Sequence, residues 1–106
     1  MPFIDYNGTQ IEVDEDGYIT DISQWDEDMA RFLAEHAEGI TDLTDDHWKV
    51  INFLNAYYKE HGIAPMIRRL CKETDLKLKY IYEIFPNGPA RGACKVAGLP
   101  KPTGCV

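Results

Sequence analysis

The stretch Thr44-Asp-Asp-His-Trp-Lys-Val-Ile-Asn-Phe-Leu-Asn-Ala-Tyr-Tyr-Lys-Glu-His-Gly62 predicts a long helix, and this helix decides the fold. Thr44 is a suitable N-cap, the two aspartates after it match the positive end of the helix dipole, and Gly62 suits the C-terminal stop. Bulky apolar side chains recur along it: Trp48, Ile51, Leu54, Tyr57 and Tyr58. We expect it to be the central helix of a single small domain.

The residues before this helix predict a β-hairpin and a shorter helix. Residues 4–6 and 10–13 flank Asn7-Gly8, a pair typical of a tight type I′ hairpin turn. After a turn at residues 14–17, we expect a third strand over residues 18–22. Residues 26–38 predict a helix that ends at Gly39, because one apolar stripe follows the helical period: Trp25, Met29, Phe32, Leu33 and Ala37.

The residues after the central helix predict two helices in a helix–turn–helix-like arrangement. Pro65 suits the first position of a helix, on which Ile67, Leu70 and Cys71 would face the core. After a break at residues 74–76, residues 77–85 predict a second helix. Four of its side chains would lie on one apolar side: Leu78, Ile81, Tyr82 and Phe85.

A short helix over residues 89–97, stopped by Gly98, precedes a segment without periodicity. Pro100 and Pro102 bias this segment toward extended geometry. The predicted fold is therefore α+β and mainly helical. We expect one domain over residues 1–106, with a β-hairpin region at 1–22, an orthogonal helical bundle at 23–97 and a mobile C-terminal arm at 98–106.

Charge is distributed unevenly along the chain. Residues 1–58 carry a net charge of −12 and residues 59–106 a net charge of +5, which together give −7. The acidic half is expected to be a solvated surface, whereas the basic half would attract anionic substrates or acidic partner surfaces. With no signal peptide and no apolar stretch near the roughly 20 residues of a membrane helix, we expect a cytoplasmic protein without membrane insertion.

Three cysteines are an odd number, which argues against a disulfide framework and for reduced, reactive thiols. We expect Cys71 to be a buried, inert thiol, because it falls on the apolar face of its helix. Cys105 lies on the arm, seven residues beyond Gly98, which gives it a reach of up to about 23 Å. Gly104 removes bulk beside this thiol, so that it can enter a narrow site.

Cys94 and Cys105 form the candidate reactive pair. They lie eleven positions apart, and closing a loop of this size costs only a few kcal/mol of chain entropy. One thiol would carry and the other resolve, with a basic surround that favours thiolates. The histidines, His36, His47 and His61, have no metal-ligand spacing, and no phosphate-binding loop is present, so the sequence predicts no bound metal or cofactor.

The C-terminal stretch Phe85-Pro-Asn-Gly-Pro-Ala-Arg-Gly-Ala-Cys-Lys-Val-Ala-Gly-Leu-Pro-Lys-Pro-Thr-Gly-Cys-Val106 closely resembles the signature of the DsrC/TusE sulfur-carrier family. Three upstream stretches resemble the family as well: Val13-Asp-Glu-Asp-Gly-Tyr18, Asp46-His-Trp-Lys-Val-Ile-Asn-Phe-Leu-Asn-Ala-Tyr-Tyr58 and Gly62-Ile-Ala-Pro-Met-Ile-Arg68. The resemblance thus covers nearly the whole chain. The compact run over residues 76–86 is similar to the sulfite-reducing DsrC branch.

This resemblance implies a small sulfur carrier that is a co-substrate or subunit and does not catalyse alone. Cys105 would accept sulfur beside the sirohaem of a separate dissimilatory sulfite reductase, DsrAB, and bridge it to Cys94 as a trisulfide. A membrane complex, DsrMKJOP, would then reduce the bridge. Arg91, Lys95 and Lys101 are the candidate partner-binding cations, together with Gly104 on the arm.

Two alternatives stay open at this point. In a TusE-type relay for tRNA thiolation, Cys94 would be dispensable. In a DNA-binding regulator, residues 65–85 would act as a helix–turn–helix, but the strongly acidic chain lacks the basic footprint of DNA readers and argues against nucleic acid.

Overall fold

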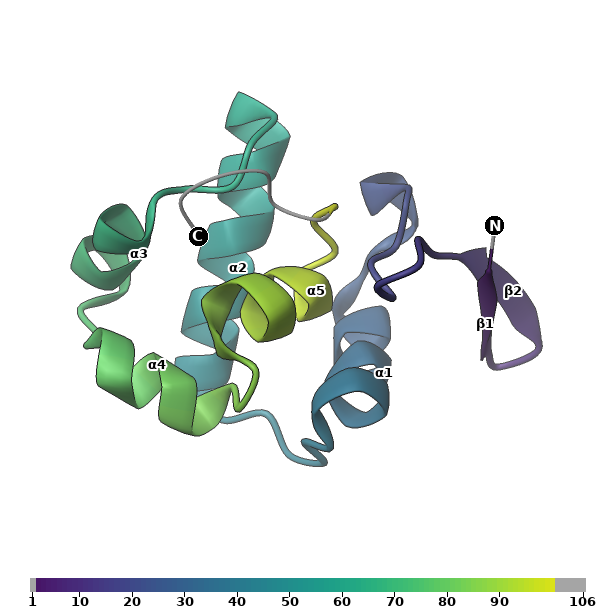
Figure 1. Cartoon of the computed structure of the whole chain (residues 1–106), viewed down its shortest axis with the longest axis horizontal. Helices are drawn as coiled ribbons and strands as arrows, with labels where there is room; N and C mark the ends of the chain where they lie inside the picture. Colours follow the sequence, from purple (N-terminus) through teal and green to yellow (C-terminus); the bar gives the residue numbers. More distant parts are fainter. Residues whose placement is uncertain (1, 101–106) are drawn as a thin grey trace.

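In the computed structural model, which describes residues 2–100, an N-terminal hairpin precedes a bundle of short helices (Figure 1). The predicted fold, mainly helical with an N-terminal hairpin, is confirmed. The elements in chain order are β1 Phe3–Tyr6, β2 Thr9–Glu12, the 3₁₀ turn η1 Ile22–Gln24, α1 Glu27–Glu38, α2 Asp45–His61, α3 Ile67–Thr74, α4 Leu78–Ile84, the π-helical turn η2 Pro89–Ala93 and α5 Cys94–Val96.

The hairpin has the predicted turn. Asn7 and Gly8 have φ angles of +50° and +87°, as a type I′ turn requires, and Tyr6 pairs with Thr9 across it. The predicted third strand is wrong: beyond β2, Val13 and Ile19 form one isolated bridge. The chain then leaves the sheet because the Asp21 carboxylate accepts a hydrogen bond from the Ser23 backbone amide and begins η1.

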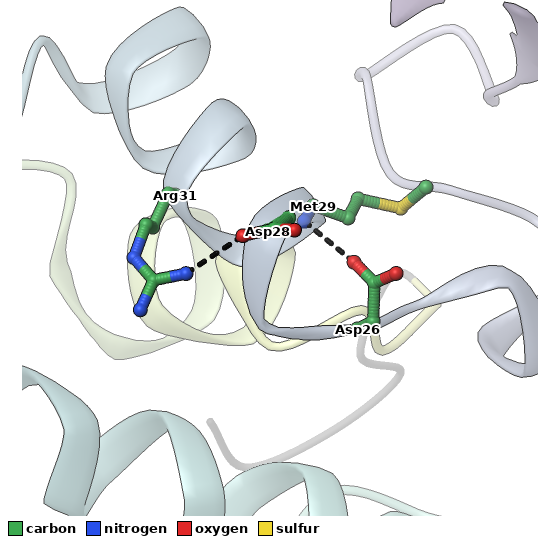
Figure 2. Close-up of polar contacts among 4 residues, drawn as sticks. All are labelled: Asp26, Asp28, Met29 and Arg31. Carbon is green, nitrogen blue, oxygen red and sulfur yellow. Dashed lines mark hydrogen bonds and ion pairs between the residues drawn. The ribbon is translucent and has the colours of Figure 1, made fainter.

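Helix α1 begins at a side-chain cap, shown in Figure 2. The Asp26 carboxylate accepts a hydrogen bond of 2.8 Å from the Met29 backbone amide, and Arg31 pairs with Asp28 one turn along at 2.8 Å. At the other end Gly39 adopts the left-handed conformation, with a φ of +68°. The helix therefore begins and ends where local sequence predicts, and its buried side chains face the core: Met29, Ala30, Leu33 and Ala34.

Helix α2 is the central helix, as predicted, and contacts both α3 and α5. Its first turn is closed by a capping box, in which the Thr44 backbone amide donates to His47 Nδ1 at 2.9 Å. His47 Nε2 then donates to the Ile84 carbonyl oxygen at 2.8 Å, so this buried histidine joins α2 to α4. His47 is therefore a capping residue of α2.

The helical pair differs in detail from the prediction. Helix α3 begins at Ile67, with Met66 as its N-cap, so Pro65 lies before the helix and not at its first position. On α4 and at its C-cap, Ile81 and Phe85 are buried, but Leu78 and Tyr82 are 39% and 52% exposed. Only a narrow stripe of so short a helix meets the core. Leu78, three positions before Ile81, and Tyr82, one position after it, fall outside this stripe.

Helix α5 lies between α1 and α2 in Figure 1 and contacts both. Although it is short, nearly every residue from Gly92 to Leu99 is buried, and its side chains join the hydrophobic core. The hairpin lies at the opposite side of α1 from α2 in the same view. Within residues 2–100, no helix is both long and apolar enough to cross a membrane.

Candidate functional site

Cys94 is the first residue of α5, and its side chain is fully buried in the core. Burial raises the pKa of this thiol to about 12, because the interior cannot solvate a thiolate. The expectation that a basic surround would favour thiolate is therefore wrong for Cys94, because burial decides its pKa. In this state Cys94 is a protonated thiol, shielded from solution oxidants.

Hydrogen bonds to the carbonyl oxygens of residues 94–97 fix the backbone around Cys94. A helix leaves its last four carbonyls without partners inside the helix, so these groups need partners elsewhere. Two bonds close a Schellman motif: Leu99 N donates to Cys94 O at 3.1 Å and Gly98 N donates to Lys95 O at 3.2 Å. The other two carbonyls accept from distant side chains. Trp25 Nε1 donates to Val96 O at 2.9 Å, and Asn55 Nδ2 donates to Ala97 O at 2.8 Å.

Both the backbone conformation and the surroundings of residue 98 require glycine at this position. Its φ is +84°, and a Cβ at this position would lie 2.6 Å from Trp25 Cδ1. Leu99 follows fully buried, whereas Pro100 is exposed. Gly98 and Leu99, which the sequence placed on the mobile arm, thus belong to the packed body. We call the segment Cys94–Leu99 the root, because the residues that carry Cys105 continue from it.

A second close contact fixes η2, the turn that leads into Cys94. The Glu38 carboxylate accepts hydrogen bonds from the backbone amide and the side-chain amide of Asn87. It also lies directly against Gly92, so that a Cβ at this position would displace the carboxylate. Burial raises the pKa of Glu38, while the Asn87 bonds and the charge of Lys95 lower it by smaller amounts. Glu38 therefore anchors the end of α1 to the turn that positions Cys94.

A small cavity of about 130 Å³ opens beside the root and is lined by Asp16, Tyr18, Arg91 and Lys95. The Lys95 ammonium lies over the Tyr18 ring, 5.0 Å from its centroid. The pKa of Tyr18 is raised to about 12, first by burial and then by its electrostatic interaction with Cys94, which acts once that thiol loses its proton. The cavity thus brings two cations, a carboxylate and a phenol together beside the root.

Cys71 lies on α3 and is half-buried, packed at the edge of the core. The prediction of a buried thiol is wrong for Cys71, because the neighbouring Leu70 takes the central position on that helix face; that Cys71 is inert stays a prediction. Of the two thiols that the structure describes, Cys94 is the buried one.

The structure brings together three of the candidate residues: Cys94, Arg91 and Lys95. Arg91 is exposed and Lys95 half-buried. The other three, Lys101, Gly104 and Cys105, lie outside the described residues. Sequence reasoning missed Asp16, Tyr18, Glu38 and Asn55 as parts of this region, and Trp25 was assigned only to an apolar stripe. No local pattern indicates them, since each reaches the root from a distant part of the chain.

These features define a class: a small helical protein with a hairpin at its N-terminus and a buried thiol at the root of a C-terminal segment that carries a second cysteine. The model of the DsrC family, described as "DsrC like protein", matches residues 5–106. The chain belongs to the DsrC family.

Similar proteins include both branches of this family. Over their full lengths, the chain is 53% identical to the dissimilatory-type sulfite reductase subunit gamma of Nitratidesulfovibrio vulgaris. It is 44% identical to the sulfurtransferase TusE homolog of Haemophilus influenzae, over 97% of this chain and 99% of that protein. The crystal structure of the oxidized gamma subunit DsrC of Archaeoglobus fulgidus superposes with a TM-score of 0.85 at 44% identity, over 99% of this chain and 100% of that one.

Proposed function

We propose that this protein carries sulfur in dissimilatory sulfite reduction: Cys105 accepts sulfur derived from sulfite, and Cys94 resolves it into a bridge between the two thiols. The observation that carries the proposal is Cys94 itself, a buried thiol held at the root of the segment that carries Cys105. Four carbonyl hydrogen bonds fix the residues after it and so hold this thiol at a defined position.

The placement of the two thiols fits a division of roles. Cys94 is anchored in the core and cannot enter another protein, whereas Cys105 is six residues beyond Leu99, the last buried residue of the root. Six residues extend up to about 20 Å, enough to reach into a partner's active site. The high pKa of Cys94 keeps this thiol protonated and unreactive until the sulfur-loaded arm returns to it.

The resolving step balances if the sulfur arrives on Cys105 as a group S–S–OH. The Cys94 thiol attacks the outer sulfur, a sulfur–sulfur bond forms, the S–OH bond breaks, and hydroxide leaves with the thiol proton as water. The product is a trisulfide between Cys94 and Cys105. Its release as two thiols and hydrogen sulfide consumes four electrons and four protons, which an external reductant must supply.

The partners follow from the relatives' names and the family resemblance. The Nitratidesulfovibrio relative is named as a subunit of a dissimilatory sulfite reductase. We propose that this chain likewise works with a DsrAB-type enzyme, whose sirohaem reduces sulfite while the arm is inserted, and that the DsrMKJOP complex reduces the trisulfide. Arg91, Lys95 and Lys101 would steer the root and the arm toward an acidic surface.

A TusE-type relay is the second candidate, favoured by the 44% sequence identity to a TusE homolog. It requires only Cys105, so a buried thiol at the root would have no role. Sulfur transfer that proceeds unchanged after Cys94→Ala would favour the relay over the proposal.

The test is single-turnover sulfite reduction by the reductase with the wild-type protein, Cys94→Ala or Cys105→Ala, followed by intact mass analysis. We expect Cys105→Ala to abolish acceptance of sulfur. Cys94→Ala should still accept it but form no bridged product, because the arm has no thiol to meet at the root. A Cys105→Ala protein that acquires sulfur on Cys94 at the wild-type rate would contradict the proposal.

A further inference from the structure

Cys94 is enclosed in the described state, so a reaction at this thiol requires part of its surroundings to move. Its side chain is fully buried, and burial raises the pKa of the thiol to about 12. Helices α1 and α2 lie on either side of α5 (Figure 1) and contact it. Because these two helices carry much of the core, they cannot separate without unfolding the bundle. The movable part must therefore lie in the root itself.

The root is held in two different ways along its length. As far as residue 97 it is held by distant side chains: Trp25 and Asn55 donate to the carbonyl oxygens of residues 96 and 97, at 2.9 and 2.8 Å. Residues 98 and 99 are held by the two backbone bonds of the Schellman motif, and no helix or strand follows them in the part of the chain that the structure describes. The Schellman bonds can therefore break while the bonds of Trp25 and Asn55 remain.

Leu99 is the residue of this releasable part that covers Cys94. Its backbone amide donates to the Cys94 carbonyl oxygen at 3.1 Å, across the Schellman motif. Side chains in these two positions of the motif commonly make an apolar contact, and both residues are fully buried in the same core. The next residue, Pro100, is exposed. Leu99 therefore lies beside Cys94 at the point where the chain passes from the core into solvent.

We propose that Leu99 is a lid over the Cys94 thiol, which opens by rotation at Gly98 while Trp25 and Asn55 keep α5 in place. Gly98 suits a hinge, because glycine adopts many backbone conformations besides its present φ of +84°. Opening breaks two backbone hydrogen bonds and exposes one leucine, a small change compared with unfolding. The role of the lid in bridging rests on the proposed function, whereas the lid itself rests on these contacts.

Opening the lid serves the resolving step in two ways. It removes the burial that raises the pKa of Cys94, so that a larger fraction of this thiol ionises. It also frees residues 98 and 99, so that the segment carrying Cys105 has two more residues with which to fold back on Cys94. With the lid closed, Cys94 stays shielded from oxidants until the arm returns.

Labelling of Cys94 with iodoacetamide tests the lid in a Cys71→Ser/Cys105→Ser parent chain, at several denaturant concentrations below the unfolding transition. We expect a labelling rate that does not change with denaturant, because opening of the lid exposes little surface. Leu99→Ala should label Cys94 at least about tenfold faster, since loss of a buried leucine side chain favours the open state. Leu99→Met, which keeps the volume, should stay within about threefold of the parent.

Leu70→Ala is the matched control, because Leu70 is also fully buried but lies on α3. It should lower the free energy of unfolding yet leave the labelling rate at low denaturant within about twofold. The lid is overturned if Leu99→Ala labels no faster than the parent, or if Leu70→Ala accelerates labelling equally. A parent rate that rises with denaturant as steeply as global unfolding also overturns it, because Cys94 would then be reached only in the unfolded chain.

Amide hydrogen exchange in the wild-type protein tests the hinge without a substitution. Opening at Gly98 frees the amides of Gly98 and Leu99 together, whereas the Ala97 amide keeps its bond of 2.9 Å to the Ala93 carbonyl oxygen. After correction for intrinsic rates, we expect the first two amides to share one opening equilibrium and the Ala97 amide to exchange at least about tenfold more slowly. Equal protection of all three would show that α5 opens as a unit, and would overturn the hinge.

A further experiment separates the lid from the proposed function. In a Cys71→Ser chain, Cys105 is converted to its mixed disulfide with glutathione. The Cys94 thiolate attacks the Cys105 sulfur, the bond between the two cysteines forms, and glutathione leaves as its thiolate. We expect Leu99→Ala to release glutathione at least about tenfold faster than the Cys71→Ser chain. If that chain forms the link and Leu99→Ala forms it no faster, the lid has no role in bridging while the proposed function stands; if that chain forms no link, the proposed function fails, and the labelling of Cys94 still decides whether the lid exists.

Discussion

Cys71 and Cys94 both lie on helices and both follow an apolar pattern, yet the fold treats them differently. Cys71 is half-buried at the edge of the core, whereas Cys94 is fully buried and its pKa is raised to about 12. Helix α3 meets the core with one face, but α5 is enclosed by α1 and α2. Burial of a thiol is thus decided by what surrounds its helix, and the thiol that the proposed chemistry needs is the more protected one.

The largest expected difference between these thiols is their reaction with an alkylating agent. At pH 8 only about one part in ten thousand of Cys94 is thiolate, given a pKa of about 12. In a Cys105→Ser background under native conditions, we expect Cys71 to be labelled at least about 100-fold faster than Cys94, since burial adds to the low thiolate fraction. Mass spectrometry of the two peptides measures both rates.

The denatured protein is the control for this experiment, because the two thiols should then react at similar rates. If Cys94 in the native protein is labelled as fast as Cys71, the root opens freely. The difference in protection between the two thiols would then be contradicted.

The same burial predicts how stability depends on pH. A thiol with an unfolded pKa near 9 and a folded pKa of about 12 contributes stability that is fully present below pH 9 and is lost as pH rises toward 12. Each unit of pH in this window costs up to about 1.4 kcal/mol of unfolding free energy. Denaturant unfolding at pH 8 to 11 should therefore show a shallower decline for Cys94→Ala than for wild type.

Cys71→Ala provides the matched comparison and should decline as steeply as wild type. Tyr18, whose pKa is also raised to about 12, contributes in the same direction and remains in both variants. Parallel curves for Cys94→Ala and wild type would mean that Cys94 is not shielded from solvent in solution.

A smaller effect, on the free energy of unfolding, is expected from a substitution at Gly98 that disturbs the packing of the root. Gly98→Ala combines a φ of +84° with a Cβ placed 2.6 Å from Trp25, and we expect a loss of about 2–3 kcal/mol of unfolding free energy. Gly39→Ala is the control, because Gly39 has a similar φ of +68° but nothing within 4 Å of its Cβ position. It should cost only about 1 kcal/mol.

Faster labelling of Cys94 in Gly98→Ala, but not in Gly39→Ala, would link the root to protection of this thiol. Equal loss of stability in the two variants would show that Trp25 yields to the added methyl group.

The fold was predictable where local chemistry decides it. Thr44, Gly39 and Gly62 set the ends of α1 and α2, and Asn7-Gly8 set the hairpin turn, because caps and turns depend on a few neighbouring residues. The third strand was not predictable in this way. A strand exists only with a partner, and Asp21 turns the chain away after a single bridge.

The candidate site was predictable only in part. The sequence identified Cys94, Arg91 and Lys95, but it did not show that Cys94 is fully buried or that Cys71 is only half-buried. It also missed Tyr18 and Asn55, which lie 76 and 39 positions before Cys94 in the chain and meet the root only through tertiary packing. Long-range contacts of this kind leave no periodic signal.

The most direct test of the account is to oxidise the purified protein under mild conditions and map which cysteines are joined. If Cys94 is the resolving thiol, the product should be a monomer with an intramolecular link between Cys94 and Cys105, because the short chain between them makes this closure faster than any pairing between molecules. Cys71→Ser should leave this product unchanged. A link between Cys71 and Cys105, or a dimer joined through Cys105 with Cys94 still a free thiol, would contradict the account.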